Sequence, residues 1–301
     1  MSPAPLESQG LKPLELADKQ AINAFLRAHP PQTSELTFTN LFMWRGYYRP
    51  VWRVWGEYLL IWAQPPGHEA FALPPIGPGD LTPACRELCR VLEQAGAAPS
   101  IQRVGADLLE RISPEAFAAS LDRDQSDYVY LSAELIALAG NRFHGKKNHL
   151  NKFRKAYPGH EYRPLDAGLV AQVLAMQQDW CTLKDCASDV SLANEDQAIY
   201  EALSNFEALD FVGGAILVEG RVEAFSLGEA LNPGTAVIHI EKANPALAGL
   251  YAAINQRFAA EAWAGHTYIN REQDLGLTGL RGAKESYNPH HLVDKYTLTP
   301  R

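Results

Sequence analysis

Three extended, apolar segments follow one another in the second half of the chain, and they restrict the possible folds more than any other feature. Residues 210–220, 221–231 and 235–243 read DFVGGAILVEG, RVEAFSLGEAL and TAVIHIEKA. Turn signals at 220–221 and 232–234 separate them, and connections this short join antiparallel strands. The pattern therefore predicts a three-stranded antiparallel sheet.

Helical and extended patterns alternate after these strands. A helical pattern at 248–263 precedes a short strand at 266–270, and a short helix at 280–287 precedes a last strand at 291–298. Three antiparallel strands followed by helix, strand, helix and strand is the element order in the C-terminal part of a lobe of the N-acetyltransferase-like (GNAT) superfold. The sequence predicts one such lobe here.

The first half of the chain indicates a second mixed lobe. Helical spacing at 13–29, an aromatic hairpin pattern at 50–64, a helix at 82–96 and a strand at 126–132 support it. The 301 residues also exceed one average domain of roughly 100 to 200 residues. We therefore predict an α+β protein with two GNAT-like lobes whose sheets are mixed and mostly antiparallel. The expected parts are an N-terminal lobe (1–140), a basic linking helix (141–160) and a C-terminal lobe (161–301).

The chain is acidic as a whole but carries one basic segment. Its formal net charge of −8 at pH 7 opposes general attraction to nucleic acid or anionic lipid, which proteins bind by neutralising phosphates with Lys and Arg. A polyanion must therefore meet a local patch, and residues 142–163 provide one, with Glu161 as their one acidic side chain. We predict that a polyanion contacts Arg142, Lys146, Lys147, Asn148, Lys152, Arg154 and Lys155.

The densest polar stretch of the sequence runs from 268 to 287 and reads YINREQDLGLTGLRGAKESY. Glycines allow a backbone to approach a ligand closely, and the start of the helix that follows offers free N–H groups to an anion. These properties predict a substrate site formed by Arg271, Asp274, Gly276, Gly279 and Arg281. The alternative is a surface connection held by ion pairs, such as one between Asp274 and Arg281.

Three residues are candidates for catalysis. Regular alternation along 236–243 places Glu241 and His239 on one face of a strand, and in GNAT enzymes a carboxylate near this strand commonly acts as general base. Tyr287 would protonate a leaving group, and Lys284, or Arg281 from the substrate site, would stabilise an oxyanion. The alternatives are a Glu241–Lys284 ion pair and a buried Tyr287 with a satisfied hydroxyl.

The coenzyme A version of the fold carries an Arg/Gln-x-x-Gly-x-Gly/Ala loop after this strand, because glycine amides there hold the pyrophosphate. The corresponding segment here, EKANPALAGLY at 241–251, contains Pro245 and one glycine, Gly249. The sequence therefore disfavours acetyl-CoA as the donor. It gives no firm indication of another cofactor, and it predicts no metal site.

Several motifs together resemble a known family. The segments GKKNHLNKFRK (145–155), IHIEKA (238–243) and YINREQDLGLTGLRGAKESYNP (268–289) are similar to the phosphatidylglycerol lysyltransferase C-terminal domain family. The resemblance covers most of the chain and implies a tandem GNAT arrangement akin to Fem-type peptidyl transferases. It also implies aminoacyl-tRNA as donor, with the tRNA on the basic helix, and a small-molecule or lipid head-group acceptor.

Three functions follow as hypotheses. The first is transfer of an aminoacyl group from aminoacyl-tRNA to an amine or hydroxyl. The second is acyl-CoA-dependent N-acyl transfer, which the segment at 241–251 weakens. The third is a non-catalytic protein that binds a small ligand or RNA.

The remaining expectations concern location and cysteine chemistry. The sequence shows neither a secretory signal nor an apolar run near the roughly 20 residues of a membrane span, so we expect a cytoplasmic protein without an integral membrane segment. Cys85 and Cys89 fall on one face of a predicted helix, and Cys181 and Cys186 lie far from them. We expect free thiols at these four positions.

Overall fold

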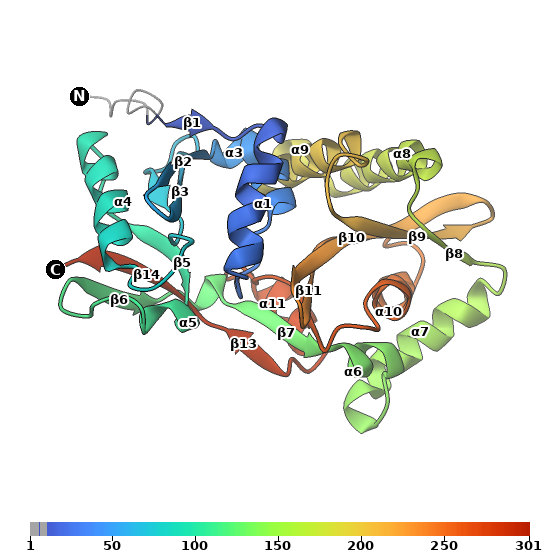
Figure 1. Cartoon of the computed structure of the whole chain (residues 1–301). Coiled ribbons are helices and arrows are strands. Elements are labelled where there is room, and N and C mark those ends of the chain that lie inside the picture. Colours follow the sequence, from blue (N-terminus) through green and yellow to red (C-terminus); the bar gives the residue numbers. More distant parts are fainter. Residues whose placement is uncertain (1–5, 7–10) are drawn as a thin grey trace. The chain divides into compact units, whose positions relative to one another are not determined.

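The computed structural model describes residue 6 and residues 11–301, which form two compact units (Figure 1). Unit 1 comprises the described residues up to Asp127 together with Val293–Arg301, and unit 2 comprises Tyr128–Leu292. These boundaries differ from the expected ones at 140 and 161. The expected last strand divides at Asp294, because its first part pairs in the sheet of unit 2 and its second part returns to unit 1.

Unit 1 is built on a seven-stranded sheet. Among its described strand pairs, the pair formed by Phe71–Ala72 and Ile101–Gly105 is parallel and the others are antiparallel. In spatial order, its strands are β1 (Lys12–Pro13), β2 (Val51–Trp55), β3 (Tyr58–Ala63), β4 (Phe71–Ala72), β5 (Ile101–Gly105), β14 (Lys295–Pro300) and β6 (Phe117–Leu121). Its helices are α1 (Lys19–Ala28), α2 (Phe38–Met43), α3 (Arg45–Tyr48), α4 (Thr82–Gln94) and α5 (Ala106–Leu109).

Helix α4 shows how the sequence pattern produces the core of unit 1. Its apolar residues recur at helical spacing, and Cys85, Leu88, Cys89 and Leu92 are buried in one cluster with the sheet. Cys85 and Cys89 are free thiols, as the sequence predicts, and burial raises the pKa of both. They therefore act as small hydrophobic residues of the core.

A buried ion cluster joins β14 to the rest of unit 1. Lys295 is fully buried, and its Nζ lies 2.6 Å from Asp127 Oδ1 and 2.7 Å from Glu35 Oε1. Burial alone would lower the pKa of Lys295, but the two carboxylates raise it. The C-terminal strand therefore inserts between β5 and β6 with its charge matched by residues from two distant parts of the chain.

Unit 2 also contains a seven-stranded mixed sheet. The three antiparallel strands that the sequence predicts between residues 210 and 243 are part of it. In spatial order, its strands are β13 (His291–Val293), β7 (Asp127–Leu131), β12 (Tyr268–Asn270), β11 (Thr235–Ala243), β10 (Arg221–Asn232), β9 (Val212–Val218) and β8 (Glu161–Pro164). Its helices are α6 (Ser132–Ala137), α7 (His144–Ala156), α8 (Ala167–Lys184), α9 (Val190–Ser204), α10 (Leu250–Ala262) and α11 (Thr278–Glu285).

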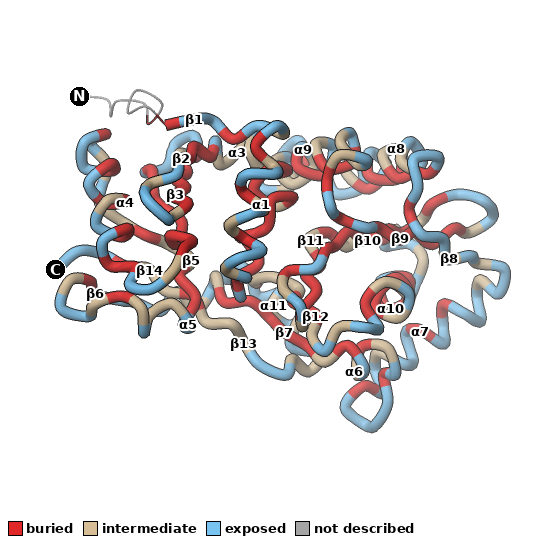
Figure 2. The backbone as a smooth tube through the Cα atoms, viewed as in Figure 1, coloured by how far each residue is buried: buried red, intermediate tan, exposed pale blue. Residues whose placement is uncertain are grey.

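Helices cover both faces of the unit 2 sheet. Ala243 of β11 packs in a hydrophobic cluster with α10, whereas the adjacent Lys242 contacts Trp180 of α8 and Glu195 of α9. Neighbouring strand residues point to opposite faces, so α10 lies on one face and α8 and α9 on the other (Figure 1). The strands between them are buried along most of their length (Figure 2).

The basic segment does not form a linker between the two units. A left-handed residue, Leu138, and Gly140 at φ 84° separate the basic segment from α6, and α7 covers His144–Ala156 rather than the whole of 141–160. The side chains of Leu150 and Phe153 are buried against α10, as their spacing predicts. Helix α7 is therefore part of unit 2.

A β-bulge in β11 overturns the prediction that His239 and Glu241 share a face. Leu227 of β10 pairs with Ile240 and the next residue, Gly228, pairs with Ile238, so His239 is an extra residue in β11. The bulge reverses the alternation beyond it. Glu241 consequently turns toward α10, whereas His239 bonds Glu229 on the other face.

The expectation of four free thiols is wrong for one pair of cysteines. Cys181 near the end of α8 and Cys186 form a disulfide. Asp185 takes a left-handed conformation, with φ 52°, and the chain reversal brings the two α-carbons to 5.0 Å. Spacing along the sequence alone could not show this local reversal.

Within residues 11–301, none of the helices combines the length and the apolar character needed to cross a membrane.

The buried cluster around Lys295 predicts a large loss of stability when its cation is removed. Lys295→Met should lower the free energy of unfolding by about 3 to 5 kcal/mol, because two buried carboxylates lose the cation that lies between them. Urea denaturation measures the change. Arg221→Met, which breaks an exposed pair with Asp179, should cost no more than about 1 kcal/mol. Equal losses in the two variants would contradict the importance of the cluster.

Candidate functional site

An ion pair between Glu241 and Arg271 forms the centre of the candidate site. Parallel pairing of β11 with β12 brings the two residues together, and Arg271 Nη2 lies 3.0 Å from Glu241 Oε1. Asn255 of α10 donates to the second carboxylate oxygen at 2.9 Å. Both charged side chains are largely buried, and Arg271 Nη1 has no hydrogen-bond acceptor among the described residues. This nitrogen is therefore a buried donor group without a partner among the described residues.

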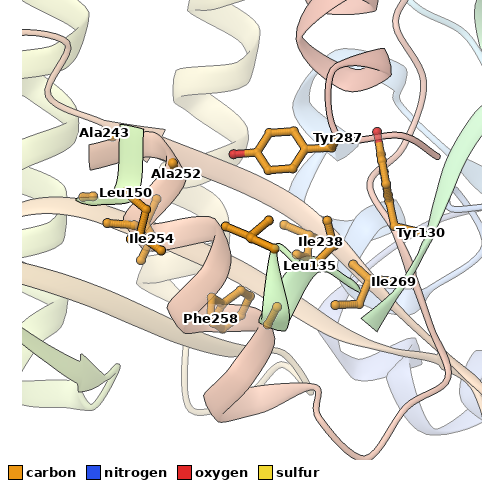
Figure 3. Close-up of a cluster of buried hydrophobic side chains, with 14 of the residues drawn as sticks. Tyr130, Leu135, Leu150, Ile238, Ala243, Ala252, Ile254, Phe258, Ile269 and Tyr287 are labelled. Atoms are coloured by element: carbon orange, nitrogen blue, oxygen red, sulfur yellow. The ribbon is translucent and has the colours of Figure 1, made fainter. Parts of the chain in front are cut away.

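Aromatic rings and a second cation surround Arg271. Its guanidinium carbon lies 4.8 Å from the ring of Tyr287 and 5.6 Å from that of Tyr130. Figure 3 shows the two tyrosines at the border of the hydrophobic cluster. Lys146 Nζ of α7 lies 4.0 Å from the Tyr287 ring, and burial together with Arg271 lowers the pKa of Lys146. Burial raises the pKa of Tyr287, so its hydroxyl stays protonated at neutral pH.

Asp274 holds the polar connection between β12 and α11 in place. It is fully buried and accepts hydrogen bonds from Tyr128 Oη at 2.6 Å, from Gly276 N at 2.9 Å and from Arg281 Nε at 2.8 Å. Burial alone would raise the pKa of Asp274, but these bonds hold it far below its usual range. The Asp274–Arg281 ion pair, considered above as the alternative to a substrate site, is therefore present.

Lys284 does not pair with Glu241, the partner considered for it from the sequence. Its Nζ donates to the backbone carbonyl of Arg271, and the ion pair of Glu241 forms with Arg271 instead. Lys284 thus supports the segment that carries Arg271. Gly276 is required because its φ is 72°, whereas a Cβ at Gly279 would meet no atom within 4 Å. Position 276 thus favours glycine for its backbone conformation, whereas no neighbouring atom crowds Gly279.

The predicted polyanion-binding residues lie on or next to α7, and they differ in their surroundings. Arg142 precedes the helix and pairs with Glu134, Arg154 donates to Gln256 of α10, and the amide of Asn148 lies 3.0 Å from His144 Nε2. The exposed side chains of the group are those of Arg142, Lys147, Asn148, Lys152, Arg154 and Lys155. Lys146 is half-buried and reaches the Arg271 site. The predicted patch therefore has two parts, an exposed group of six side chains and the inward-facing Lys146.

Gly249 serves helix packing. It precedes α10 with φ 89°, and a Cβ there would lie 2.1 Å from the backbone oxygen of His149 in α7. The backbone of α7 thus lies against the start of α10. In the coenzyme A version of the fold, the glycine loop before this helix holds the pyrophosphate. With the α7 backbone this close to the start of α10, the residues present here are a poor fit for that group.

Two site residues were missed at the sequence level. Asn255 is fully buried in α10, and its position inside an apolar helical pattern was the available signal. The second is His239, which lies between Glu229 Oε1 at 2.9 Å and Glu272 Oε1 at 2.8 Å. Burial alone would lower the pKa of His239, but the two carboxylates raise it to about 9. Glu272 adjoins Arg271, so this cluster fixes the backbone beside the site.

Comparisons with known proteins agree with this description. The sequence profile of the family described as phosphatidylglycerol lysyltransferase, C-terminal, matches residues 27–299. Among curated proteins, no relative matches the chain. A structure from Bacteroides thetaiotaomicron VPI-5482, described as a conserved protein of unknown function, is 35% identical and covers 97% of this chain and 99% of that one, with a TM-score of 0.90.

Two more distant structures share the fold. L-PGS from Bacillus licheniformis is 14% identical, with coverage of 94% of this chain and 91% of that chain and a TM-score of 0.66. FemX is 10% identical, with coverage of 93% and 95% and a TM-score of 0.57. The expected α+β fold with two GNAT-like parts and mixed, mostly antiparallel sheets is confirmed.

The buried His239 predicts a characteristic dependence of stability on pH. Because its pKa rises from about 6.5 in the unfolded chain to about 9 in the folded one, its stabilising contribution is complete below pH 6.5 and disappears as the pH passes 9. The free energy of unfolding of the wild type, minus that of His239→Gln, should therefore fall by up to about 3 kcal/mol between pH 6.5 and 9.5. Urea titrations at several pH values measure this. His149→Gln, at an exposed position, is the control, and a pH-independent difference for His239→Gln would refute the assignment.

Proposed function

Because the chain belongs to the phosphatidylglycerol lysyltransferase C-terminal domain family, we propose that it transfers an aminoacyl group from aminoacyl-tRNA to an amine or hydroxyl acceptor. The observation that carries the proposal is the position of Lys146. It connects an exposed basic helix, suited to phosphates, with a buried site in which Arg271 Nη1 has no hydrogen-bond partner among the described residues.

The donor ester would lie at the Arg271 site. Its carbonyl oxygen accepts a hydrogen bond from Arg271 Nη1, and the guanidinium stabilises the negative charge that develops on this oxygen during attack. Lys146 adds positive charge on the same side. Lys284 and Asp274 position this machinery through the backbone of Arg271 and through Arg281, and Gly276 completes the turn.

The transfer needs one proton to be removed and one to be supplied. The acceptor nitrogen or oxygen attacks the ester carbon and gives its proton to Glu241, while the carbon–oxygen bond to the tRNA ribose breaks. Tyr287 gives its proton to the departing ribose oxygen and later recovers one through solvent from Glu241. The ester is already activated, so orientation and charge stabilisation supply most of the rate.

The exposed residues of α7 would hold the tRNA phosphates. Lys147, Lys152 and Lys155 are exposed cations on a protein whose overall charge repels a polyanion, so tRNA binding should depend on this helix. The poor fit of Gly249 and its surroundings to a pyrophosphate favours this donor over acyl-CoA.

Charge reversal tests the role of α7. The triple variant Lys147→Glu, Lys152→Glu, Lys155→Glu should weaken tRNA binding by at least roughly a hundredfold at low salt and reduce the slope of log K against log salt by about 3. The control variant Arg27→Glu, Arg86→Glu, Lys184→Glu changes the net charge equally at exposed positions outside α7. Filter binding over a range of salt concentrations measures both. An equal loss in the two variants would show that only net charge matters.

Replacement of Glu241 tests the chemistry. In an assay that offers a radiolabelled pool of charged tRNAs and, separately, acetyl-CoA, the wild type should transfer label from the tRNAs. Glu241→Gln should reduce that rate by roughly a hundredfold or more. Glu261→Gln, in an exposed pair on α10, should leave it unchanged.

Circular dichroism must accompany the assay, because Arg271 loses its partner in Glu241→Gln. If that variant fails to fold, Tyr287→Phe replaces it as the test and should slow transfer while the protein remains folded. A folded Glu241→Gln protein with the wild-type rate would refute the role of Glu241 as base. Transfer from neither donor would favour a non-catalytic binding protein.

A further inference from the structure

The backbone of Glu272, the residue that follows Arg271, has a left-handed conformation. Its φ is 58°, a value that favours glycine and that costs energy in a residue with a Cβ. Such conformations persist only where the surrounding structure imposes them, and they gather at functional sites. Contacts of Glu272 with the neighbouring strands must therefore impose this conformation beside the proposed ester site.

Backbone hydrogen bonds place Glu272 in a β-bulge at the end of β12. Arg271 N donates to Tyr128 O at 2.9 Å, and Tyr128 N donates to Glu272 O at 3.1 Å. Two residues of this segment thus face a single residue of β7. The bulge in β11 at His239 lies beside this one, because the parallel pairing of β11 with β12 ends two residues before His239 and before Glu272. Two adjacent strands are therefore irregular at the same level.

The side chains of the two bulged residues bond each other. His239 Nδ1 lies 2.8 Å from Glu272 Oε1, and His239 Nε2 lies 2.9 Å from Glu229 Oε1 of β10. Only 1% of the His239 side chain is exposed, against 20% of that of Glu272. Little water can compete for these bonds, so they can offset the cost of the left-handed backbone.

Each bulge determines the direction of one residue of the Glu241–Arg271 ion pair. The extra residue in β11 turns Glu241 toward α10. At the end of β12, Arg271 bonds Glu241 on the α10 side of the sheet. Glu272, the other residue of that bulge, bonds His239 on the opposite side. The His239–Glu272 pair therefore joins the two bulges from the face opposite the ion pair.

We propose that the His239–Glu272 pair positions Arg271 for aminoacyl transfer by holding the left-handed backbone at Glu272. The inference rests on the proposed function, in which the Arg271 guanidinium must point at the ester oxygen. His239 and Glu272 act through Arg271 and are therefore positioning residues. Because their bond lies on the opposite face of the sheet, its loss should leave the tRNA-binding side chains of α7 unchanged.

Hydrogen exchange at the Arg271 guanidinium tests this positioning without an activity assay. The full chain is labelled with ¹⁵N-arginine, and exchange of the Arg271 Nη protons is followed by NMR at neutral pH, with assignment from Arg271→Lys. Glu272→Ala removes the bond to His239 but keeps a Cβ that disfavours the left-handed backbone. Exchange at Arg271 should accelerate at least roughly tenfold, because the guanidinium leaves its ordered position more often.

Further variants separate the backbone from other effects. Glu272→Gly also loses the bond but takes the left-handed conformation without steric cost, so it should accelerate exchange less than Glu272→Ala. Glu219→Ala is the matched control, because Glu219 is also left-handed, with φ 52°, and lies in the exposed turn between β9 and β10. It should leave exchange at Arg271 unchanged. If Glu272→Ala does not fold, Glu272→Gln replaces it and should accelerate exchange, because a neutral hydrogen bond is weaker than a charge-assisted one.

The kinetics of transfer connect the position of Arg271 to the reaction. With charged tRNA as donor, Glu272→Ala should lower kcat by roughly tenfold or more, because a displaced guanidinium stabilises the transition state less well. KM for the tRNA should stay unchanged, because α7 is intact. Glu219→Ala should alter neither constant.

The possible results separate clearly. Fast exchange in Glu272→Ala, slower exchange in Glu272→Gly and a lower kcat support the proposal. Unchanged exchange in a folded Glu272→Ala protein, or equal acceleration in Glu272→Gly or Glu219→Ala, would overturn it. Accelerated exchange with the wild-type kcat would also overturn it, because the position of Arg271 would then not limit transfer. If the wild type transfers from neither donor, the proposed function fails, while the exchange rates still decide whether the pair positions Arg271.

Discussion

The arrangement of the Arg271 site depends on the buried carboxylate of Asp274. Its two oxygens accept bonds from a strand residue, Tyr128, from a loop amide, at Gly276, and from a helix residue, Arg281. A buried charge is tolerated only when such partners compensate for the lost water, so all three elements must be in place together. The segment that starts with Arg271 is thereby held between two fixed points, the end of β12 and the start of α11.

Packing between α7 and α10 places positive charge beside this buried centre. Only glycine at position 249 allows the α7 backbone to lie against the start of α10, and this contact is where the coenzyme A version of the fold holds its pyrophosphate. The same packing lets Lys146 reach the ring of Tyr287. The close packing of α7 on α10 therefore leaves no room for a coenzyme contact and brings Lys146 to the site. Both effects favour the proposed donor, aminoacyl-tRNA, over acyl-CoA.

Charge is distributed unevenly over the helices of unit 2. The exposed side of α7 is basic, whereas α8 and α9 carry Asp179, Glu195 and Asp196. A polyanion would therefore be attracted to α7 and repelled by α8 and α9 of the same unit. The net charge of −8 conceals this separation, because it sums opposite local charges.

The sequence by itself determined the order of the elements, the mixed sheets, the buried face of α7 and the segment from 268 to 287 as the centre of polar contacts. These follow from local periodicity and turn residues, which depend on near neighbours. The tertiary structure alone decided that β14 returns to unit 1, that Cys181 and Cys186 are bonded, and that Arg271 rather than Lys284 pairs with Glu241. It also decided that the extra residue at His239 turns Glu241 toward α10. Each of these depends on strand register, chain reversal or contacts between distant residues, and a pattern of neighbours does not encode them.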